Sequence, residues 1–196
     1  MITIIGLGNP GKEYEGTRHN AGREAAFYFA KKHDLEPFAL NKKANAIIIK
    51  SKIGKEQIFL ALPETFMNKS GSAAAKLMRP KKEMKNLIVI HDDLDILIGK
   101  FKVSYGKNSG GHKGVESVMR AMKTKNFVRI RIGICPPARG VSAVGRKPDQ
   151  KKLINFIVNK FSSTEQTIIK KVWKRVAQAL ETIITDSLER AMSEYN

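Results

Sequence analysis

The feature that most constrains the fold is a β-branched run near the amino terminus, residues 2–7, which leads into Gly-Leu-Gly-Asn-Pro-Gly. A continuous apolar run of this length predicts a strand buried on both faces. The spelling G-x-G-x-x-G also matches the phosphate loop of dinucleotide-binding folds. Those folds further require a helix that begins at the last glycine and an acidic residue that ends the next strand.

Neither requirement is met. Residues 11–19, "GKEYEGTRH", carry charges, a second glycine and no apolar stripe, and a helical pattern begins only near Asn20. The next predicted strand ends in Lys-Ser-Lys, and Asp34 follows a helix rather than a strand. Because an isolated G-x-G-x-x-G is weak evidence without that context, we do not expect a dinucleotide site.

Strand-like and helical patterns are mixed along the rest of the chain. They predict one α/β domain over residues 1–196, a three-layer sandwich whose twisted, mixed and mostly parallel sheet is flanked by helices. Strands are expected at 46–50, 57–62, 87–91, 100–105 and 129–134, and helices at 20–33, 71–79, after Gly114 and after the capping box at 162–165. The runs at 100–105 and 129–134 alternate, so each should expose one face. Residues 136–150 predict an irregular loop that could serve as a mobile lid.

Charge is the informative part of the composition. Lysine and arginine number 36 against 18 acidic residues, a formal net charge of +18, which favours a polyanion partner, nucleic acid before an acidic membrane. A single cysteine, Cys135, excludes an intrachain disulfide and suits a reducing compartment. No apolar run approaches the roughly 18 residues of a membrane span, and the amino terminus lacks the basic start of a signal peptide. We therefore expect a cytoplasmic protein without a membrane partner.

Polar side chains that can do chemistry gather after the predicted strands. In open α/β sheets, ligands collect at the carboxyl ends of strands, so these groups should converge. A neutral histidine can take a proton from water, a carboxylate behind it fixes its tautomer, and carboxamides can donate to an oxyanion. No serine lies in a G-x-S-x-G elbow and the set holds no cysteine, so water is the expected nucleophile and ester hydrolysis the natural reaction. The residues concerned are Asn9, His19, Asn68, His91, Asp92, Asp93, Asp95, His112 and Lys113.

Each of these residues also has a plainer interpretation. His91 follows four apolar residues and could be a structural core histidine, or it could bind a metal with the carboxylates that follow it. Asn68 could be a helix N-cap, and Asn9 a turn residue. His112 and Lys113 could shape a glycine-rich loop or touch phosphate.

At these residues the chain resembles the bacterial peptidyl-tRNA hydrolase family. The matching segments are "GLGNPGKEYEGTRHNAG", "PETFMNKSG", "HDDLD", "GKFK", "SGGHKG" and "NFVRIRIGI", in the order and spacing of the family. The resemblance implies a single-domain α/β fold and hydrolysis, without metal or other cofactor, of the ester that joins a peptide to the terminal ribose of tRNA. It also implies a monomer that binds the acceptor stem and 5′-phosphate of peptidyl-tRNA.

The resemblance also assigns roles to residues. His19 would be the general base, Asp92 would orient it, and Asn9 and Asn68 would bind the peptide and steady the oxyanion. Tyr14 would support the site, and further substrate contacts would come from Phe66, Met67, His112 and Lys113. Lys102 and Arg131 would clamp the tRNA 5′-phosphate, with Lys100 and Arg129 as secondary contacts.

The chain departs from the family at two places. Lys113 stands where the family reads asparagine in G-G-H-N-G, and Cys135 replaces a glycine. A charged lysine cannot accept a hydrogen bond, but it could donate to the oxyanion or grip the tRNA 3′ end, and its charge should lower the pKa of His19. Two rival hypotheses remain: a non-catalytic RNA-binding protein on the same scaffold, like the plastid splicing-factor relatives, and a nicotinamide-dependent enzyme.

Overall fold

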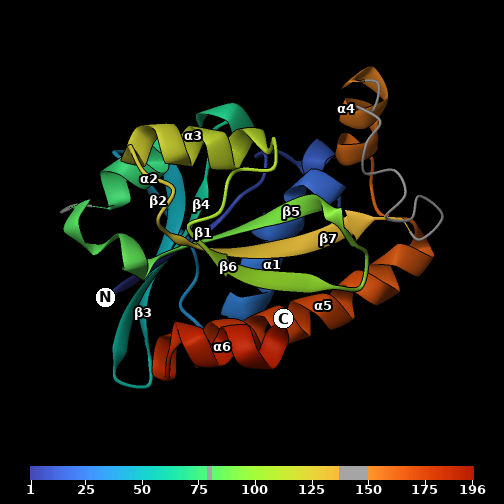
Figure 1. The fold of residues 1–196 in the computed structure, drawn as a ribbon. Coiled ribbons are helices and arrows are strands. Elements are labelled where there is room, and N and C mark those ends of the chain that lie inside the picture. The colour runs from blue at the N-terminus through green and yellow to red at the C-terminus, as the bar shows by residue number, and fades with distance from the viewer. Residues whose placement is uncertain (79–80, 137–149) are drawn as a thin grey trace.

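The computed structural model describes residues 1–78, 81–136 and 150–196. Within these residues, seven strands form one sheet in the order β2-β3-β4-β1-β5-β7-β6 (Figure 1). The strands are β1 (Ile2–Gly6), β2 (Ala39–Asn41), β3 (Ala46–Ile53), β4 (Glu56–Pro63), β5 (Leu87–Leu97), β6 (Phe101–Tyr105) and β7 (Val128–Cys135).

The sheet is mixed, as predicted. The central strands β4, β1, β5 and β7 are parallel to one another, whereas β2–β3, β3–β4 and β6–β7 pair antiparallel. Half of the pairs in the described sheet are therefore parallel, and they lie in its centre. This arrangement brings the carboxyl ends of β1, β4 and β5 to the same edge of the sheet.

Helices cover both faces of the sheet and make the predicted three layers. On one face lie α1 (Ala21–Lys32), α5 (Ser163–Thr185) and α6 (Leu188–Tyr195), and on the other lie α2 (Gly71–Leu77) and α3 (Lys113–Met122) (Figure 1). The helix α4 (Gln150–Val158) stands apart and touches the short 3-10 helix η2 (Arg18–Asn20). Three further 3-10 helices are η1 (Lys12–Tyr14), η3 (Met67–Lys69) and η4 (Lys81–Asn86).

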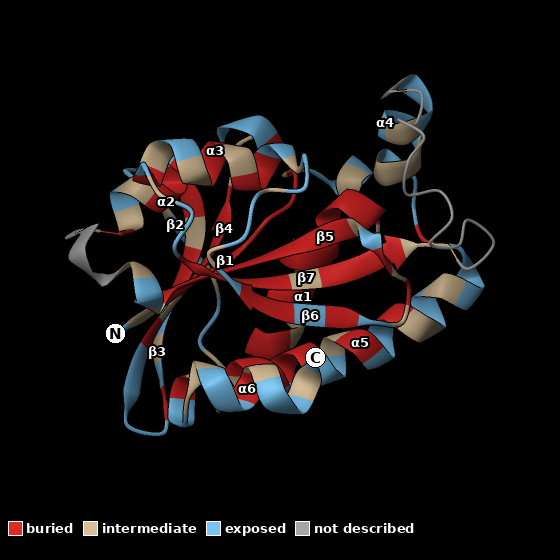
Figure 2. Ribbon diagram, in the orientation of Figure 1, coloured by how far each residue is buried: buried red, intermediate tan, exposed pale blue. Residues whose placement is uncertain are grey.

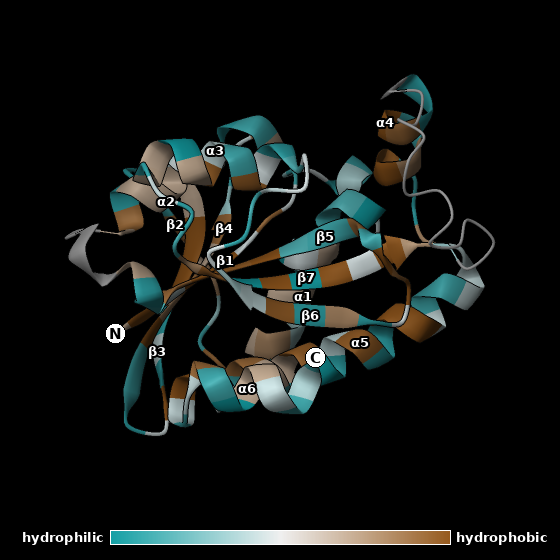
Figure 3. Cartoon of the chain, viewed as in Figure 1, coloured by the Kyte–Doolittle hydropathy of each residue, from teal (hydrophilic) through white to brown (hydrophobic). Residues whose placement is uncertain are grey.

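Apolar side chains fill both spaces between the layers. Figure 2 shows the central strands largely buried, and Figure 3 shows that hydrophobic residues predominate in them except toward the carboxyl end of β5, which is hydrophilic. One cluster joins Ile4 and Phe29 to Val176 of α5, and a second joins Val89 to Val115 of α3. The capping box expected at 162–165 is confirmed at the start of α5, whose buried face includes Val172, Val176 and Leu180.

The glycines of the amino-terminal motif serve packing. A Cβ on Gly6 would lie 2.7 Å from Ala26 Cβ, and a Cβ on Gly8 would lie 2.7 Å from Arg23 Cβ. On the facing helix, a Cβ on Gly22 would lie 2.2 Å from the Ile90 carbonyl oxygen. These small residues let α1 approach the sheet closely. Because α1 begins at Ala21 and not at the motif, the helix context of a dinucleotide site is absent, as expected.

Two expected boundaries were wrong. Asp92 and Asp93 do not follow the strand but lie inside β5, because β7 pairs with them at Ile132 and Gly133. Helix α3 begins at Lys113 rather than after Gly114. The lid predicted at 136–150 lies, for residues 137–149, outside the described part of the chain, and its last residue begins α4.

Candidate active site

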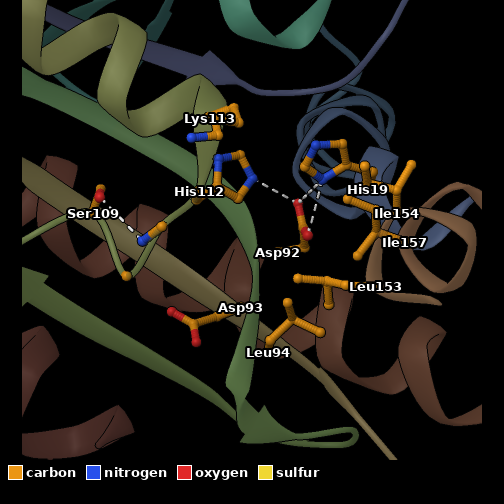
Figure 4. Close-up of a pocket in the computed structure, with 12 residues that line it drawn as sticks. His19, Asp92, Asp93, Leu94, Ser109, His112, Lys113, Leu153, Ile154 and Ile157 are labelled. Carbon is orange, nitrogen blue, oxygen red and sulfur yellow. Dashed lines mark hydrogen bonds and ion pairs between the residues drawn. The ribbon is translucent and has the colours of Figure 1, made fainter. Parts of the chain in front are cut away.

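Three separate elements bring two imidazoles and a carboxylate together. The 3-10 helix η2 carries His19, β5 carries Asp92, and His112 stands at the N-cap of α3. They meet in a cleft of about 520 Å³ (Figure 4). The described residues that line it are His19, Asp92, Asp93, Leu94, Ser109, Gly110, Gly111, His112, Lys113, Leu153, Ile154 and Ile157.

Asp92 is the centre of this group and is 3% exposed. Both of its carboxylate oxygens lie 3.0 Å from His19 Nδ1, and its Oδ1 lies 2.8 Å from His112 Nε2. A buried carboxylate needs hydrogen-bond donors in place of water, and here the two rings supply them.

The protons on these rings follow from their partners. His112 Nδ1 accepts hydrogen bonds from the backbone N–H groups of Gly114 and Val115, at 3.1 and 3.2 Å. That nitrogen therefore carries no proton, so His112 is the neutral Nε2–H tautomer and donates to Asp92. His19 donates to the same carboxylate through Nδ1. In the neutral His19 ring, Nε2 is consequently a free base.

The charges around Asp92 set the pKa values of the pair. Burial raises the pKa of Asp92, but the adjacent rings of His19 and His112 outweigh burial and hold it well below its usual range. Burial lowers the pKa of His19, but the charge of Asp92 and its hydrogen bond raise this pKa by more than burial lowers it. The net pKa shift of His19 is therefore upward. The expected lowering by Lys113 is not observed, because its side chain is 70% exposed and pairs with Glu116 at 3.2 Å.

His91 is the structural core histidine of the plainer interpretation. It is fully buried, and its Nδ1 donates to the backbone carbonyl oxygen of Asp92 at 2.6 Å. Burial and the neighbouring His112 ring lower the pKa of His91 well below its usual value, so the ring is neutral. Its Nδ1 is thus engaged with backbone and is not turned toward a metal.

His19, Asp92 and His112 offer ligand atoms within 4.8 Å of one another, which a metal ion could in principle use. Ligation by His112 Nε2 would require its proton to move to Nδ1. Because Nδ1 accepts hydrogen bonds from the two backbone N–H groups of α3, a proton on Nδ1 would break both bonds and place three N–H groups against one another. The donor set therefore fits two ring protons on one carboxylate better than an ion.

The predicted asparagines lie beside this cleft rather than among its lining residues. Asn9 is buried, and its Oδ1 accepts from Met67 N at 2.8 Å, so its Nδ2 is the donor side of the amide. The Asn20 side chain holds the Asn9 backbone at 2.8 and 3.0 Å. Asn68 is exposed in η3, next to Met67. The N-cap position of the helix after it is Ser70, so Asn68 is not its N-cap.

The other expected substrate contacts lie in different surroundings. Tyr14 is partly buried in η1, and Phe66 is an exposed side chain. Met67 is packed in the core, where a Cβ on Gly114 would lie 2.4 Å from its sulfur. Since Gly114 follows His112 closely, Met67 connects the asparagines to the His112 side of the cleft.

The basic residues divide into surface and buried groups. Lys100 and Lys102 are exposed, and Arg131 donates through Nε to Asp93 Oδ2 at 2.7 Å. Arg129 is 1% exposed, and its Nη2 donates to the Asn108 carbonyl oxygen at 2.9 Å. Burial and nearby Arg131 lower the pKa of Arg129 to about 10. The expected exposed face of this strand was wrong at Arg129, which is buried and bonded to the loop residue Asn108.

Two parts of the site were not predicted from the sequence. The first is the bond from His112 to Asp92, for which the only sequence signal was a histidine before a helical pattern. The second is the apolar wall of Leu94, Leu153, Ile154 and Ile157, three of which come from α4. No expected helix covered that segment, although Leu153, Ile154 and Ile157 stand at helical spacing in it.

The fold and the cleft define an enzyme class. Among the described lining residues, Ser109 carries the one hydroxyl, and it contacts Gly111 N and Glu116 rather than an imidazole. An α/β sandwich with a histidine base backed by aspartate is suited to activate water for hydrolysis.

Comparison with known proteins gives the family. Residues 3–196 match the sequence profile of the family described as Peptidyl-tRNA hydrolase. The chain is 36% identical over 197 residues to a peptidyl-tRNA hydrolase of Alkaliphilus metalliredigens, and 38% identical over 199 residues to one of Dehalococcoides mccartyi; each alignment covers all of both proteins. The crystal structure of peptidyl-tRNA hydrolase from Acinetobacter baumannii is similar with a TM-score of 0.88 at 28% identity, covering 100% of this chain and 94% of that one.

The chain belongs to the peptidyl-tRNA hydrolase family. It is a hydrolase of translation that releases tRNA from peptidyl-tRNA. In the described part of the chain, no helix is both long enough and apolar enough to cross a membrane.

Proposed function

We propose that His19 activates a water molecule to cleave the ester between the peptide and the terminal ribose of tRNA. The observation that carries this proposal is the contact of His19 Nδ1 with both oxygens of buried Asp92, at 3.0 Å. The contact leaves His19 Nε2 as the basic atom. It also provides a negative charge that stabilises the imidazolium formed when the ring takes a proton.

The reaction proceeds in two proton transfers. His19 Nε2 removes a proton from water while the water oxygen bonds to the ester carbonyl carbon. The carbonyl oxygen becomes an oxyanion, and Asn9 Nδ2 and Asn68 donate hydrogen bonds to it. When the tetrahedral intermediate collapses, the bond to the ribose oxygen breaks and that oxygen takes the proton from His19. The products are a peptide with a free carboxyl group and a tRNA with a free terminal hydroxyl.

The proposed reaction uses no metal ion or other cofactor. A metal would have to displace the His112 proton that Asp92 accepts, against the hydrogen bonds from Gly114 and Val115. His112 therefore acts as a positioning residue that holds Asp92 through Oδ1, beside the His19 ring at a centroid distance of 4.9 Å. Tyr14, Phe66, Met67 and Lys113 complete the proposed contacts with the peptide and the tRNA 3′ end.

The proposed tRNA grip lies on β6 and β7. Lys102 and Arg131 are direct cross-strand partners, so their charges lie close together. Like charges in that position favour an anion between them, and Asp93 already pairs with Arg131 at 2.7 Å. A 5′-phosphate would join this arrangement with Lys100 at its border. Arg129 would lie beneath this phosphate site and contribute through its positive charge near Arg131.

The proposal includes a single domain acting as a monomer in the cytoplasm. The net charge of +18 suits a backbone-dominated contact with RNA, which should weaken steeply with salt.

The test is hydrolysis of purified peptidyl-tRNA by the wild type, by His19→Ala and by His33→Gln as the matched control. His33 lies at the end of α1 and contacts Glu181, away from the cleft. We expect His19→Ala to lose at least about a thousandfold in turnover, because the base that takes the proton from water is removed. This variant should bind tRNA normally, because the proposed tRNA contact lies on β6 and β7. Near-normal turnover by His19→Ala would exclude the mechanism.

A further inference from the structure

Arg18 precedes His19 in the sequence but contacts a different part of the molecule. It is 9% exposed, and its Nη1 donates to the carbonyl oxygens of Phe156, Asn159 and Lys160 at 3.3, 3.2 and 3.1 Å. Its Nη2 forms an ion pair with Glu165 at 2.7 Å. One guanidinium thus joins the end of α4 to the start of α5.

These carbonyl groups belong to the carboxyl-terminal end of α4, where a helix leaves backbone oxygens without partners. A cation at this end also interacts favourably with the helix dipole. The guanidinium carbon lies 4.4 Å from the centre of the Phe156 ring and 5.5 Å from that of Phe161. Backbone bonds run in parallel, from Arg18 N to Asn159 O at 3.1 Å and from Phe161 N to Gly16 O at 3.0 Å.

The other end of this connection is the wall of the cleft. Helix α4 supplies Leu153, Ile154 and Ile157 to the lining, and Ile154 is 56% exposed (Figure 4). Nine residues form a marginal helix in isolation, so α4 depends on its docking contacts. Helix α4 contacts η2, the 3-10 helix that begins at Arg18, so the contacts of Arg18 are central to the docking of α4.

We propose that Arg18 is a positioning residue that fastens α4 to the loop carrying His19 and so sets the affinity of the cleft for apolar side chains of the peptide. This inference rests on the proposed function, because it concerns the peptide part of the same substrate. Arg18 touches neither water nor ester and contributes to binding rather than to proton transfer.

The proposal predicts a separation of kinetic constants. In Arg18→Ala, α4 loses its anchor, and KM for peptidyl-tRNA with a leucine or phenylalanine next to the ester should rise about tenfold or more, the effect of losing one buried apolar contact. A substrate with glycine at that position should change less than about twofold, because it makes no such contact. The kcat values and their pH profile should remain those of the wild type, because the His19–Asp92 pair is unchanged.

Two further variants isolate the guanidinium. Glu165→Gln keeps the capping box, in which the Glu165 side chain accepts from Ser162 N at 2.8 Å, but it removes the charge paired with Arg18. It should move KM in the same direction by a smaller factor. Arg18→Lys keeps the charge without the planar fork and should restore only part of the affinity.

Arg23 provides the matched control. It is also 9% exposed and donates to the Pro63 carbonyl oxygen at 2.9 Å, but it lies in α1. Arg23→Lys should leave hydrogen exchange of the α4 amides at the wild-type rate, whereas Arg18→Ala should speed it at least about tenfold. The positioning role would be overturned if Arg18→Ala changed KM by the same factor for the apolar and the glycine substrates. It would also be overturned if hydrogen exchange of the α4 amides were unchanged in Arg18→Ala and Glu165→Gln. Absence of wild-type turnover would instead refute the proposed function.

Discussion

Replacing Asp92 by asparagine tests the proton assignment most directly. The His112 proton is fixed on Nε2, because Gly114 N and Val115 N occupy its other nitrogen. The new side chain therefore keeps its oxygen at the Oδ1 position, 2.8 Å from His112 Nε2, and its NH₂ takes the Oδ2 position, 3.0 Å from His19 Nδ1, where a ring N–H would oppose it. His19 Nδ1 then becomes an acceptor. The ring proton moves to Nε2, and the basic atom is lost.

The size of the effect follows from this wrong tautomer. Equivalent substitutions behind a catalytic histidine cost about 10⁴ in turnover, and each factor of ten corresponds to about 1.4 kcal/mol of activation free energy. We expect Asp92→Asn to lose about 10³–10⁴ in kcat, with KM little changed. The assay is single-turnover release of labelled peptide from peptidyl-tRNA.

A second substitution should give part of this loss back. His112→Asn keeps an N-cap side chain for α3 but is too short to reach residue 92. In the double variant Asp92→Asn/His112→Asn, the amide oxygen is free to turn toward His19 and restore the Nδ1–H tautomer. We expect at least about tenfold more activity than in Asp92→Asn alone, a coupling that additive effects cannot produce. A double variant equal to or worse than the single one would refute the tautomer assignment.

Three other predictions follow from the same structure. Because the pKa of His19 is raised, kcat/KM should rise with pH along a limb whose midpoint lies above the ordinary histidine value of about 6.5, and Lys113→Asn should not move this midpoint, since Lys113 pairs with Glu116. Gly22→Ala should lower the free energy of unfolding by about 3 kcal/mol in urea titrations, since its Cβ would lie 2.2 Å from the Ile90 oxygen. Because the pKa of His91 is lowered, the unfolded chain binds a proton at this residue below about pH 6.5 that the folded chain does not bind. The free energy of unfolding should therefore decrease as the pH drops below about 6.5, and it should decrease less steeply in His91→Gln. The raised pKa of His19 acts in the opposite direction.

The layers and most elements of the fold could be predicted because their signals are local. Apolar periodicity specifies α1 and α5, the latter with a capping box, and the hairpin of β3 and β4 follows from a glycine turn between two apolar runs. The end of β5 could not be predicted, because it depends on pairing with β7, more than thirty residues further along the chain. The burial of Arg129 has the same origin, since a distant turn covers it.

The candidate site could be predicted in part. His19 and Asp92 were expected together, and the structure brings them into contact. The role of His112 depends on the direction of a ring relative to a helix that begins beside it, which residue spacing does not encode. Helix α4 was missed although Leu153, Phe156 and Ile157 have helical spacing, and its place beside the cleft depends on docking against Arg18, which is far away in the sequence.

The two acidic residues at the end of β5 show how one extended segment can serve two chemistries. Successive side chains of a strand leave it in opposite directions, so Asp92 reaches the imidazoles while Asp93 reaches Arg131. The proposed ester-cleaving group and the proposed tRNA contact thereby share a single peptide unit. A one-residue shift in the register of this segment would turn Asp92 away from the imidazoles and Asp93 away from Arg131, so both proposed activities depend on the same pairing of β5 with β7.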